Sequence, residues 1–313
     1  LPAVMAMLST AIYNVVDTAF IGLLDDTASI GAAAVLFPVF LLVGAIGLTF
    51  GTGAGSIISR KLGAGKYQSA KQTASTAFYT SLIAGIVFAI IVNIFITQIL
   101  RFFGASESIL ERAVIYGRII IGGSFFQIVK MCMNNLLRSE GASAYSGKAM
   151  ILGAGLNIIL DPIFMFVFNW GLAGAAIATI TAQAASALFM FRFFAAKKGI
   201  LSLSPSFFRP NFQEYREILA IGMPAFARQV LMSLAMGLLI NAAAEYGDPA
   251  VAAVGITKKV VSLVVMVVFG IGQGLQPLAG YNYGAKQIGR VVESVNLALK
   301  WALIFTLSMA VVF

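Results

Sequence analysis

Acidic side chains stand inside two otherwise apolar stretches of this chain. Asp17 lies in the run YNVVDT, and Asp161 lies in LNIILDP together with Asn157. Because Asn157 and Asp161 are four residues apart, a helix places them on one face, one turn from each other. Pro162 lacks an N–H, which frees the carbonyl of Ile158 from its helical hydrogen bond. Carboxylate, amide and carbonyl oxygens are hard ligands, so these residues predict a site for a small cation or a proton.

Thr179 adds a hydroxyl oxygen to this set. It ends the small-residue run GAAIAT at 174–179, which favours close packing of its helix. A charged side chain deep in a membrane costs at least about 2.5 kcal/mol, so intramembrane acids are functional by default. The alternative is that Asp17 and Asp161 lie near the membrane surface as helix caps, or pair with basic residues. An internal repeat puts Leu239 at the position equivalent to Asp17, and this asymmetry favours a site.

A further polar group follows helical spacing between the two acids. Gln127, Lys130 and Asn134 are separated by three and four residues, which places them on one helical face. A lysine exposed to lipid is unfavourable, so we expect this face to border a substrate cavity. The spacing leaves open whether these side chains contact the substrate or only hydrate the cavity.

The composition indicates what kind of protein positions these residues. Of the 313 residues, 60% are apolar and 11% are charged, and the mean hydropathy is +0.94. Soluble domains carry about 25% charged residues, so this chain has too little charge for a water-facing exterior. Its apolar runs exceed the roughly 20 residues that cross a bilayer, and they do not alternate as strands would. The sequence therefore predicts an all-α polytopic membrane protein.

Residue counts exclude several classes of function. The chain has no histidine and a single cysteine, Cys132. A histidine-based catalytic triad and an intrachain disulfide are therefore impossible, and a zinc site has almost no ligands. We thus expect neither an enzyme nor a cofactor. The net charge of +9 is spread between apolar segments, which indicates membrane topology and not nucleic-acid binding.

Nine membrane spans are predicted, and the net charge of the loops that connect them alternates in sign. The spans cover residues 1–23, 32–58, 74–99, 114–137, 149–168, 171–195, 218–244, 250–280 and 291–313. The loops after the first and seventh spans are acidic, whereas those after the second, fourth, sixth and eighth carry lysine and arginine. Basic loops stay in the cytoplasm, so we predict a multi-pass protein of the plasma (inner) membrane with a cytoplasmic N-terminus.

The chain also repeats itself after the sixth span. The run FGTGAG at 50–55 returns as FGIGQG at 269–274, and a Pro-Ala pair opens both the first and the seventh spans. Six spans separate the copies, so both enter the membrane in the same direction, as in parallel transporter repeats. We therefore predict two six-helix lobes: an N-terminal lobe at 1–196, a cytoplasmic linker at 197–217, and three helices of a C-terminal lobe at 218–313. Because a second copy needs six helices, the chain is expected to be truncated.

Five motifs in this order resemble the multidrug and toxic compound extrusion (MATE) family of secondary transporters. They are YNVVDTAFIG at 13–22, LRSEG at 137–141, NIILDPIF at 157–164, GAAIAT at 174–179 and GYNYGA at 280–285. The likeness covers essentially the whole chain. It implies two six-helix lobes around a central cavity that opens alternately to each side of the membrane. It also implies export of organic, often cationic, compounds driven by inward sodium ions or protons.

The resemblance assigns roles to residues as well. In prokaryotic members the N-terminal lobe binds the coupling cation. The residues that match this site are Asp17, Asn157, Asp161 and Thr179, with the backbone carbonyl of Ala175 as a weaker candidate. If sodium is the coupling ion, the four side chains are its expected ligands. Some branches place an acid in the seventh span, but residues 230–233 here contain none, which favours coupling through the N-terminal lobe.

Two other functions stay open at the level of the sequence. A flippase for lipid-linked sugar precursors has a similar lobe plan, but it needs several arginines in its cavity, and the arginines here lie mostly in loops. A non-transporting membrane sensor would not need a site with paired acids. For the transporter we expect a monomer whose partners are the lipid bilayer and small organic substrates.

Overall fold

Long apolar runs become helices because a membrane offers the backbone no water, and a helix satisfies its own polar groups. The computed structural model describes residues 2–24, 27–244 and 248–312, and within these ranges it contains helices and no strand. The predicted acidic loop residues Asp25, Asp26 and Glu245 lie outside the described residues. Within them, seven helices are long and apolar enough to cross a membrane, and a bent pair makes an eighth. One further long helix, α9 (Phe212–Ala244), covers the remaining predicted span, so the all-α fold with about nine membrane helices is confirmed.

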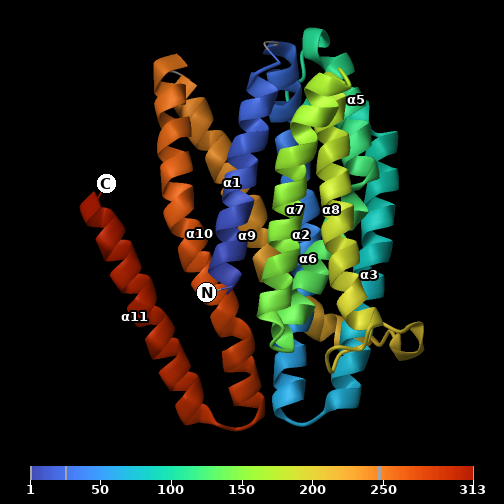
Figure 1. Cartoon of the computed structure of the whole chain (residues 1–313), viewed down its shortest axis with the longest axis vertical. Helices are drawn as coiled ribbons and strands as arrows, with labels where there is room; N and C mark the ends of the chain where they lie inside the picture. Colours follow the sequence, from blue (N-terminus) through green and yellow to red (C-terminus); the bar gives the residue numbers. More distant parts are fainter. Residues whose placement is uncertain (1, 25–26, 245–247, 313) are drawn as a thin grey trace.

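The first six predicted spans form one bundle (Figure 1). Its helices are α1 (Pro2–Gly22), α2 (Thr27–Gly63), α3 (Tyr67–Ile94), the short α4 (Ile96–Phe102), α5 (Glu107–Gly122), α6 (Ser124–Ser139), α7 (Ser143–Pro162) and α8 (Gly171–Ala195). A π-helical turn, η1 (Ile163–Val167), continues α7 directly after Pro162. With 37 residues, α2 is about 55 Å long and exceeds the roughly 30 Å hydrocarbon layer. Helices of this bundle therefore run beyond the predicted spans.

The fourth predicted span, 114–137, is not one straight helix. It is divided between α5 and α6, which meet at an angle of 42°. Gly122 and Gly123 stand at the break, where small residues without a Cβ favour a kink. A Cβ on Gly123 would come within 2.6 Å of the Ile180 side chain on α8. The glycine therefore allows α8 to pack directly against the break.

Three helices follow the bundle, namely α9, α10 (Asp248–Gly284) and α11 (Ile288–Val312). Before them, the chain between α8 and α9 contains one short 3₁₀ turn, η2 (Pro205–Phe207). The start of α9 at Phe212 precedes the predicted start at 218, so this helix extends into the predicted linker. Figure 1 shows α11 at the outer edge, where it packs on α10. In contrast, α1 lies between the two groups and contacts both α7 and α10.

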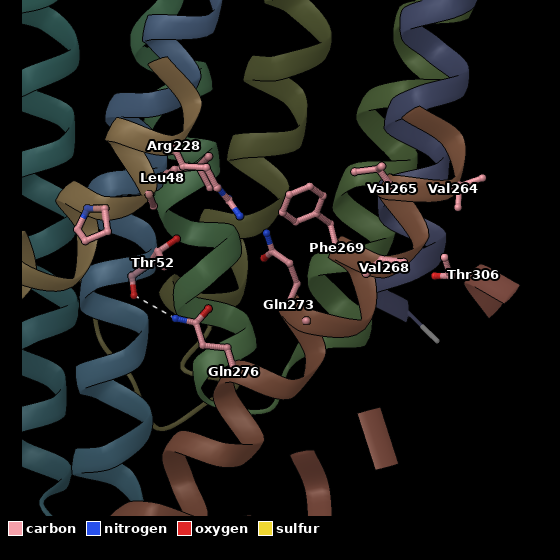
Figure 2. A pocket seen from close by; sticks show the side chains of 13 residues that line it. Leu48, Thr52, Arg228, Val264, Val265, Val268, Phe269, Gln273, Gln276 and Thr306 are labelled. Carbon is pink, nitrogen blue, oxygen red and sulfur yellow. Dashed lines mark hydrogen bonds between the residues drawn. The ribbon is translucent and has the colours of Figure 1, made fainter. Parts of the chain in front are cut away.

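Glycines let α2 approach α10 closely at the end of the molecule that carries the basic loops. A Cβ on Gly63 would lie 1.9 Å from the carbonyl oxygen of Tyr281, and a Cβ on Gly284 would lie 2.0 Å from that of Arg60. The glycine of each helix thus faces the backbone of the other. Nearer its middle, α2 instead borders an open cavity together with α9 and α10 (Figure 2).

Polar contacts fasten the first turn of α9 to the same end of the bundle. Lys61 Nζ lies 3.2 Å from Glu214 Oε1, and the hydroxyl of Thr73 donates a hydrogen bond to the same carboxylate. The hydroxyl groups of Tyr215 and Thr80 share a hydrogen bond of 2.8 Å. These contacts join α9 to α2 and α3, so they hold the two groups of helices together at this end.

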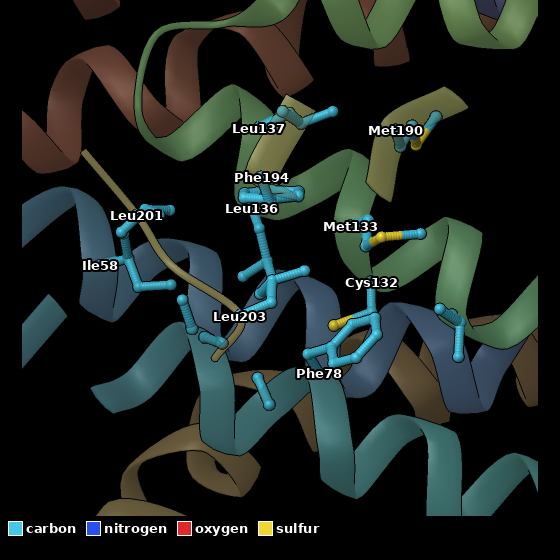
Figure 3. Close-up of a cluster of buried hydrophobic side chains, with 14 of the residues drawn as sticks. Ile58, Phe78, Cys132, Met133, Leu136, Leu137, Met190, Phe194, Leu201 and Leu203 are labelled. Carbon is cyan, nitrogen blue, oxygen red and sulfur yellow. The ribbon is translucent and has the colours of Figure 1, made fainter. Parts of the chain in front are cut away.

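Buried hydrophobic side chains form two clusters, one toward each end of the N-terminal bundle. The cluster nearer the basic loops includes Ile58, Leu136 and Phe194 from three helices (Figure 3). Leu201 and Leu203 of the linker are also part of it. The linker is therefore packed against the bundle rather than being a free tether.

Candidate cation site and substrate cavity

The packing of α1 against α7 brings the two intramembrane acids together. The carboxyl groups of Asp17 and Asp161 lie close enough to interact directly. Asn157 lies one turn before Asp161, and its Nδ2 donates to Asp161 Oδ1 at 3.0 Å. The same Nδ2 lies 3.4 Å from Thr179 Oγ1 on α8. The side chains predicted to form the cation site therefore meet where α1, α7 and α8 converge.

This group is shielded from solvent and has spare acceptors. Asp161 is 0% exposed and Asn157 is 3% exposed. Asp17 Oδ1, Asn157 Oδ1 and Asp161 Oδ2 are buried and have no hydrogen-bond partner. A buried acceptor without a partner is costly, and a bound cation or proton would satisfy it. The donor set, made of oxygen atoms only, therefore fits the hard cation that the sequence predicts.

Two further observations bear on this site. Ala175 is fully buried on α8, and its four-residue spacing places its backbone one turn from Thr179. The alternative interpretation paired the acids with basic residues, but in the described part of the chain no ion pair involves Asp17 or Asp161. Each acid instead has the other as its charged neighbour, an arrangement expected of a functional site rather than of a surface ion pair.

Two tyrosines near the acids were not singled out from the sequence. Tyr13 on α1 and Tyr116 on α5 lie close enough to both carboxyl groups for electrostatic interaction. The position of Tyr13, four residues before Asp17, is a signal that helical spacing offers. Tyr116 is distant in sequence from both acids, so only the folded structure brings it to the site.

The predicted polar stripe on α6 lies within the N-terminal bundle. Gln127 and Asn134 are 9% and 5% exposed, and Lys130 is half-buried. Gln127 Oε1 accepts a hydrogen bond of 3.3 Å from Gln183 on α8. None of the three is among the described residues that line the open cavity. Their assignment to a substrate cavity stays a prediction.

The open cavity has a volume of about 840 Å³ and lies between α2, α9, α10 and α11. Its walls include Leu48 and Thr52 from α2 and Val265 from α10. Figure 2 shows Arg228 of α9 reaching into this space toward Phe269 of α10. The guanidinium carbon lies 4.7 Å from the centre of the Phe269 ring, which is a cation–π contact.

Arg228 is the main residue that the sequence reasoning missed. It stands in an otherwise apolar span, four residues after Pro224. The rule that singled out Asp17, that an ionisable residue inside a span is functional by default, applies to it equally.

Comparisons with known proteins agree with the fold. The sequence model of the MatE family matches residues 2–163 and 224–313. Two relatives are the multidrug export protein MepA of Staphylococcus aureus (strain NCTC 8325 / PS 47), 33% identical over 315 residues, and MepA of Staphylococcus haemolyticus (strain JCSC1435), 33% identical over 314 residues. Each alignment covers 100% of this chain and 69% of the relative.

A solved structure gives the same result in three dimensions. It is the outward-facing conformation of a multidrug resistance MATE family transporter of the MOP superfamily. The TM-score is 0.94 at 29% sequence identity, and the match covers 98% of this chain and 68% of that one. By its sequence and by its fold, this chain belongs to the MATE family, whose members are membrane transporters and not enzymes.

Proposed function

We propose that this protein exports organic compounds by antiport, in which an inward flow of sodium ions or protons drives the substrate out. Its relative MepA is a multidrug export protein. The observation that carries the antiport is the set of three buried oxygens without partners at Asp17, Asn157 and Asp161. An exporter powered by a cation gradient needs such a site, and a non-transporting sensor does not.

The cation acts through the charge of the acid pair. A sodium ion would be held by the carboxylates of Asp17 and Asp161 and by the oxygens of Asn157 and Thr179, whereas a proton would be held by the carboxyl pair alone. Either ion reduces the repulsion between the acids and lets α1 repack against α7. If this lowers the affinity for the substrate, the substrate must weaken cation binding by the same factor.

The membrane arrangement follows from the charges of the loops. We propose an N-terminal lobe at 1–196, a linker at 197–217 and three helices of a C-terminal lobe at 218–313. The basic loops, including the one with Lys66, face the cytoplasm, and so does the N-terminus. We expect the protein to work as a monomer, because one chain supplies every side chain of the acid site.

Efflux from lipid vesicles tests the proposal. The protein is reconstituted, the vesicles are loaded with a fluorescent organic dye, and sodium and proton gradients are imposed separately. We expect efflux to accelerate under at least one gradient and to return to the passive rate when an ionophore collapses it. A dye flux that responds to neither gradient contradicts antiport.

A further inference from the structure

The cavity between α2, α9 and α10 carries a positive charge. Among the described residues that line it, Arg228 alone is ionised at neutral pH. Its side chain is exposed to the cavity rather than packed in the protein. An arginine inside a membrane span is energetically unfavourable, so it is expected to have a function. The contact with Phe269 orients the guanidinium but leaves its N–H donors available, because a cation–π contact uses the face of the group.

The rest of the wall is suited to an apolar molecule with a polar end. Leu48, Val265 and Val268 supply hydrophobic surface. On α10, Gln276 Nε2 donates to the carbonyl oxygen of Thr52 at 3.3 Å. Gln273 also lines the wall. The cavity thus combines apolar walls, a guanidinium and polar amide groups.

We propose that this cavity selects amphipathic organic anions, in which a carboxylate or sulfonate is attached to an apolar frame. Arginine presents its donors as a planar fork that matches a carboxylate in a bidentate way. A cationic substrate would instead be repelled by Arg228 within a partly desolvated space. The inference rests on the proposed export function and departs from the cationic substrates that the family resemblance implies.

A pair of probes with the same ring and opposite charges tests the inference. Binding of 2-naphthoate and of (2-naphthyl)methylammonium is measured by calorimetry, with the protein in phosphatidylcholine nanodiscs and no ion gradient. We expect the anion to bind roughly tenfold tighter than the cation, as one charge-assisted hydrogen-bonded contact allows. Equal binding, or tighter binding of the cation, overturns the inference.

Substitutions then assign the selectivity to Arg228. Arg228→Gln should weaken naphthoate binding roughly tenfold and strengthen binding of the ammonium probe. Arg290→Gln removes the same charge from an exposed residue on α11 and should change neither affinity. Because Arg228→Gln alters a membrane span, Phe269→Leu is a second variant that only releases the guanidinium, and it should weaken naphthoate binding by a smaller factor. Naphthoate binding that neither variant changes overturns the inference.

The source of the anion is a separate arm of the test. A lipid headgroup presents the same chemistry as a soluble anion, so the titration is repeated with phosphatidylglycerol in the nanodiscs. If naphthoate binding falls only in wild type and not in Arg228→Gln, a lipid headgroup also occupies the site; if it is unchanged, the site takes soluble anions. These results are independent of transport. Selective naphthoate binding without gradient-driven efflux contradicts the proposed function alone, whereas gradient-driven efflux without anion selectivity contradicts this inference alone.

Discussion

The acid site and the open cavity differ in both charge and exposure. The first holds two carboxyl groups where α1, α7 and α8 converge, that of Asp161 fully buried and that of Asp17 half-buried. The second holds a single guanidinium in a space of about 840 Å³ that is open to the outside of the protein. Within the described residues, neither site contains the charge of the other. Under the proposed antiport, this difference would separate the site of the small cation from the site of the organic substrate.

One helix joins the two regions. α1 carries Asp17 and packs on both α7 and α10. On α10, Gly270 faces α1 so closely that a Cβ would lie 2.8 Å from the Cα of Val4. The preceding residue is Phe269, which holds Arg228. A shift of α1 at the acid site therefore has a direct mechanical route to the wall of the cavity.

The largest expected effect comes from removing one acid. We predict that Asp161→Asn, and likewise Asp17→Asn, abolishes the response of dye efflux to the ion gradient, because the amide cannot take part in charge neutralisation. Naphthoate should still bind in the cavity, since Arg228 and Phe269 are unchanged in these variants. The measurement is efflux from vesicles with the gradient switched on and off.

The matched control for the acid variants is Glu107→Gln. It makes the same chemical change at an exposed residue that pairs with Arg101 at 3.0 Å, and surface ion pairs contribute little. If Asp161→Asn responds to the gradient as fully as this control does, the acid pair is not the coupling site.

A smaller effect is expected from separating the two sites without changing either one. Gly270→Ala adds a methyl group that backbone atoms of α1 must avoid, so α1 should move away from α10. We predict that the efflux driven by a given ion gradient falls several-fold, while naphthoate affinity changes little. Gly272→Ala is the control two residues further on, because a Cβ there meets no atom within 4 Å. Equal losses in both variants would indicate general destabilisation and not uncoupling.

A third effect concerns the contacts that hold the two helix groups together. Glu214→Gln removes the ion pair with Lys61 and weakens the hydrogen bond from Thr73. A hydrogen bond to a charged group contributes about 1.5–3 kcal/mol. The equilibrium constant for closing the end where α9 contacts α2 and α3 should therefore fall roughly tenfold. We expect a cysteine at Ser59, a buried residue that faces Gly280, to be labelled faster. Glu217→Gln, an exposed change one turn away, should leave labelling unchanged.

Local patterns in the sequence were sufficient to predict the helices and part of the acid site. Apolar runs longer than a bilayer predict membrane helices regardless of their neighbours, and the family that the motifs indicate is confirmed. The contact between Asn157 and Asp161 follows from helical spacing alone. Their proximity to Asp17 depends on how α1 packs on α7, so the spacing could suggest it but not establish it.

The remaining features depend on contacts between distant segments. The stacking of Arg228 on Phe269 joins α9 to α10, and no periodicity within either helix encodes it. The linker was predicted from its basic residues and prolines as a connecting loop. Its Leu201 and Leu203 nevertheless pack into the core, because the bundle offers an apolar surface that only the folded structure forms.

The smallest expected effect is the pH dependence of this linker contact. Glu140, directly after α6, accepts a hydrogen bond of 3.0 Å from the backbone N–H of Leu201. Burial raises the pKa of the Glu140 carboxyl, and the backbone hydrogen bonds from Leu201 and Ile200 lower it. The net effect is a rise from 4.5 to about 6. The folded state therefore holds this proton more tightly than the unfolded state. The resulting stability is fully present below about pH 4.5 and is lost as the pH rises through 6.

This shift corresponds to at most about 2 kcal/mol, and partial solvent screening reduces the expected loss to about 1 kcal/mol. We predict that thermal unfolding of the wild type in detergent loses a few degrees between pH 4.5 and 7 relative to Glu140→Gln, which has no proton to lose there. Glu293→Gln, at an exposed position on α11, should keep the wild-type slope. If Glu140→Gln and the wild type show parallel pH profiles, the titration of this carboxyl is not linked to the attachment of the linker.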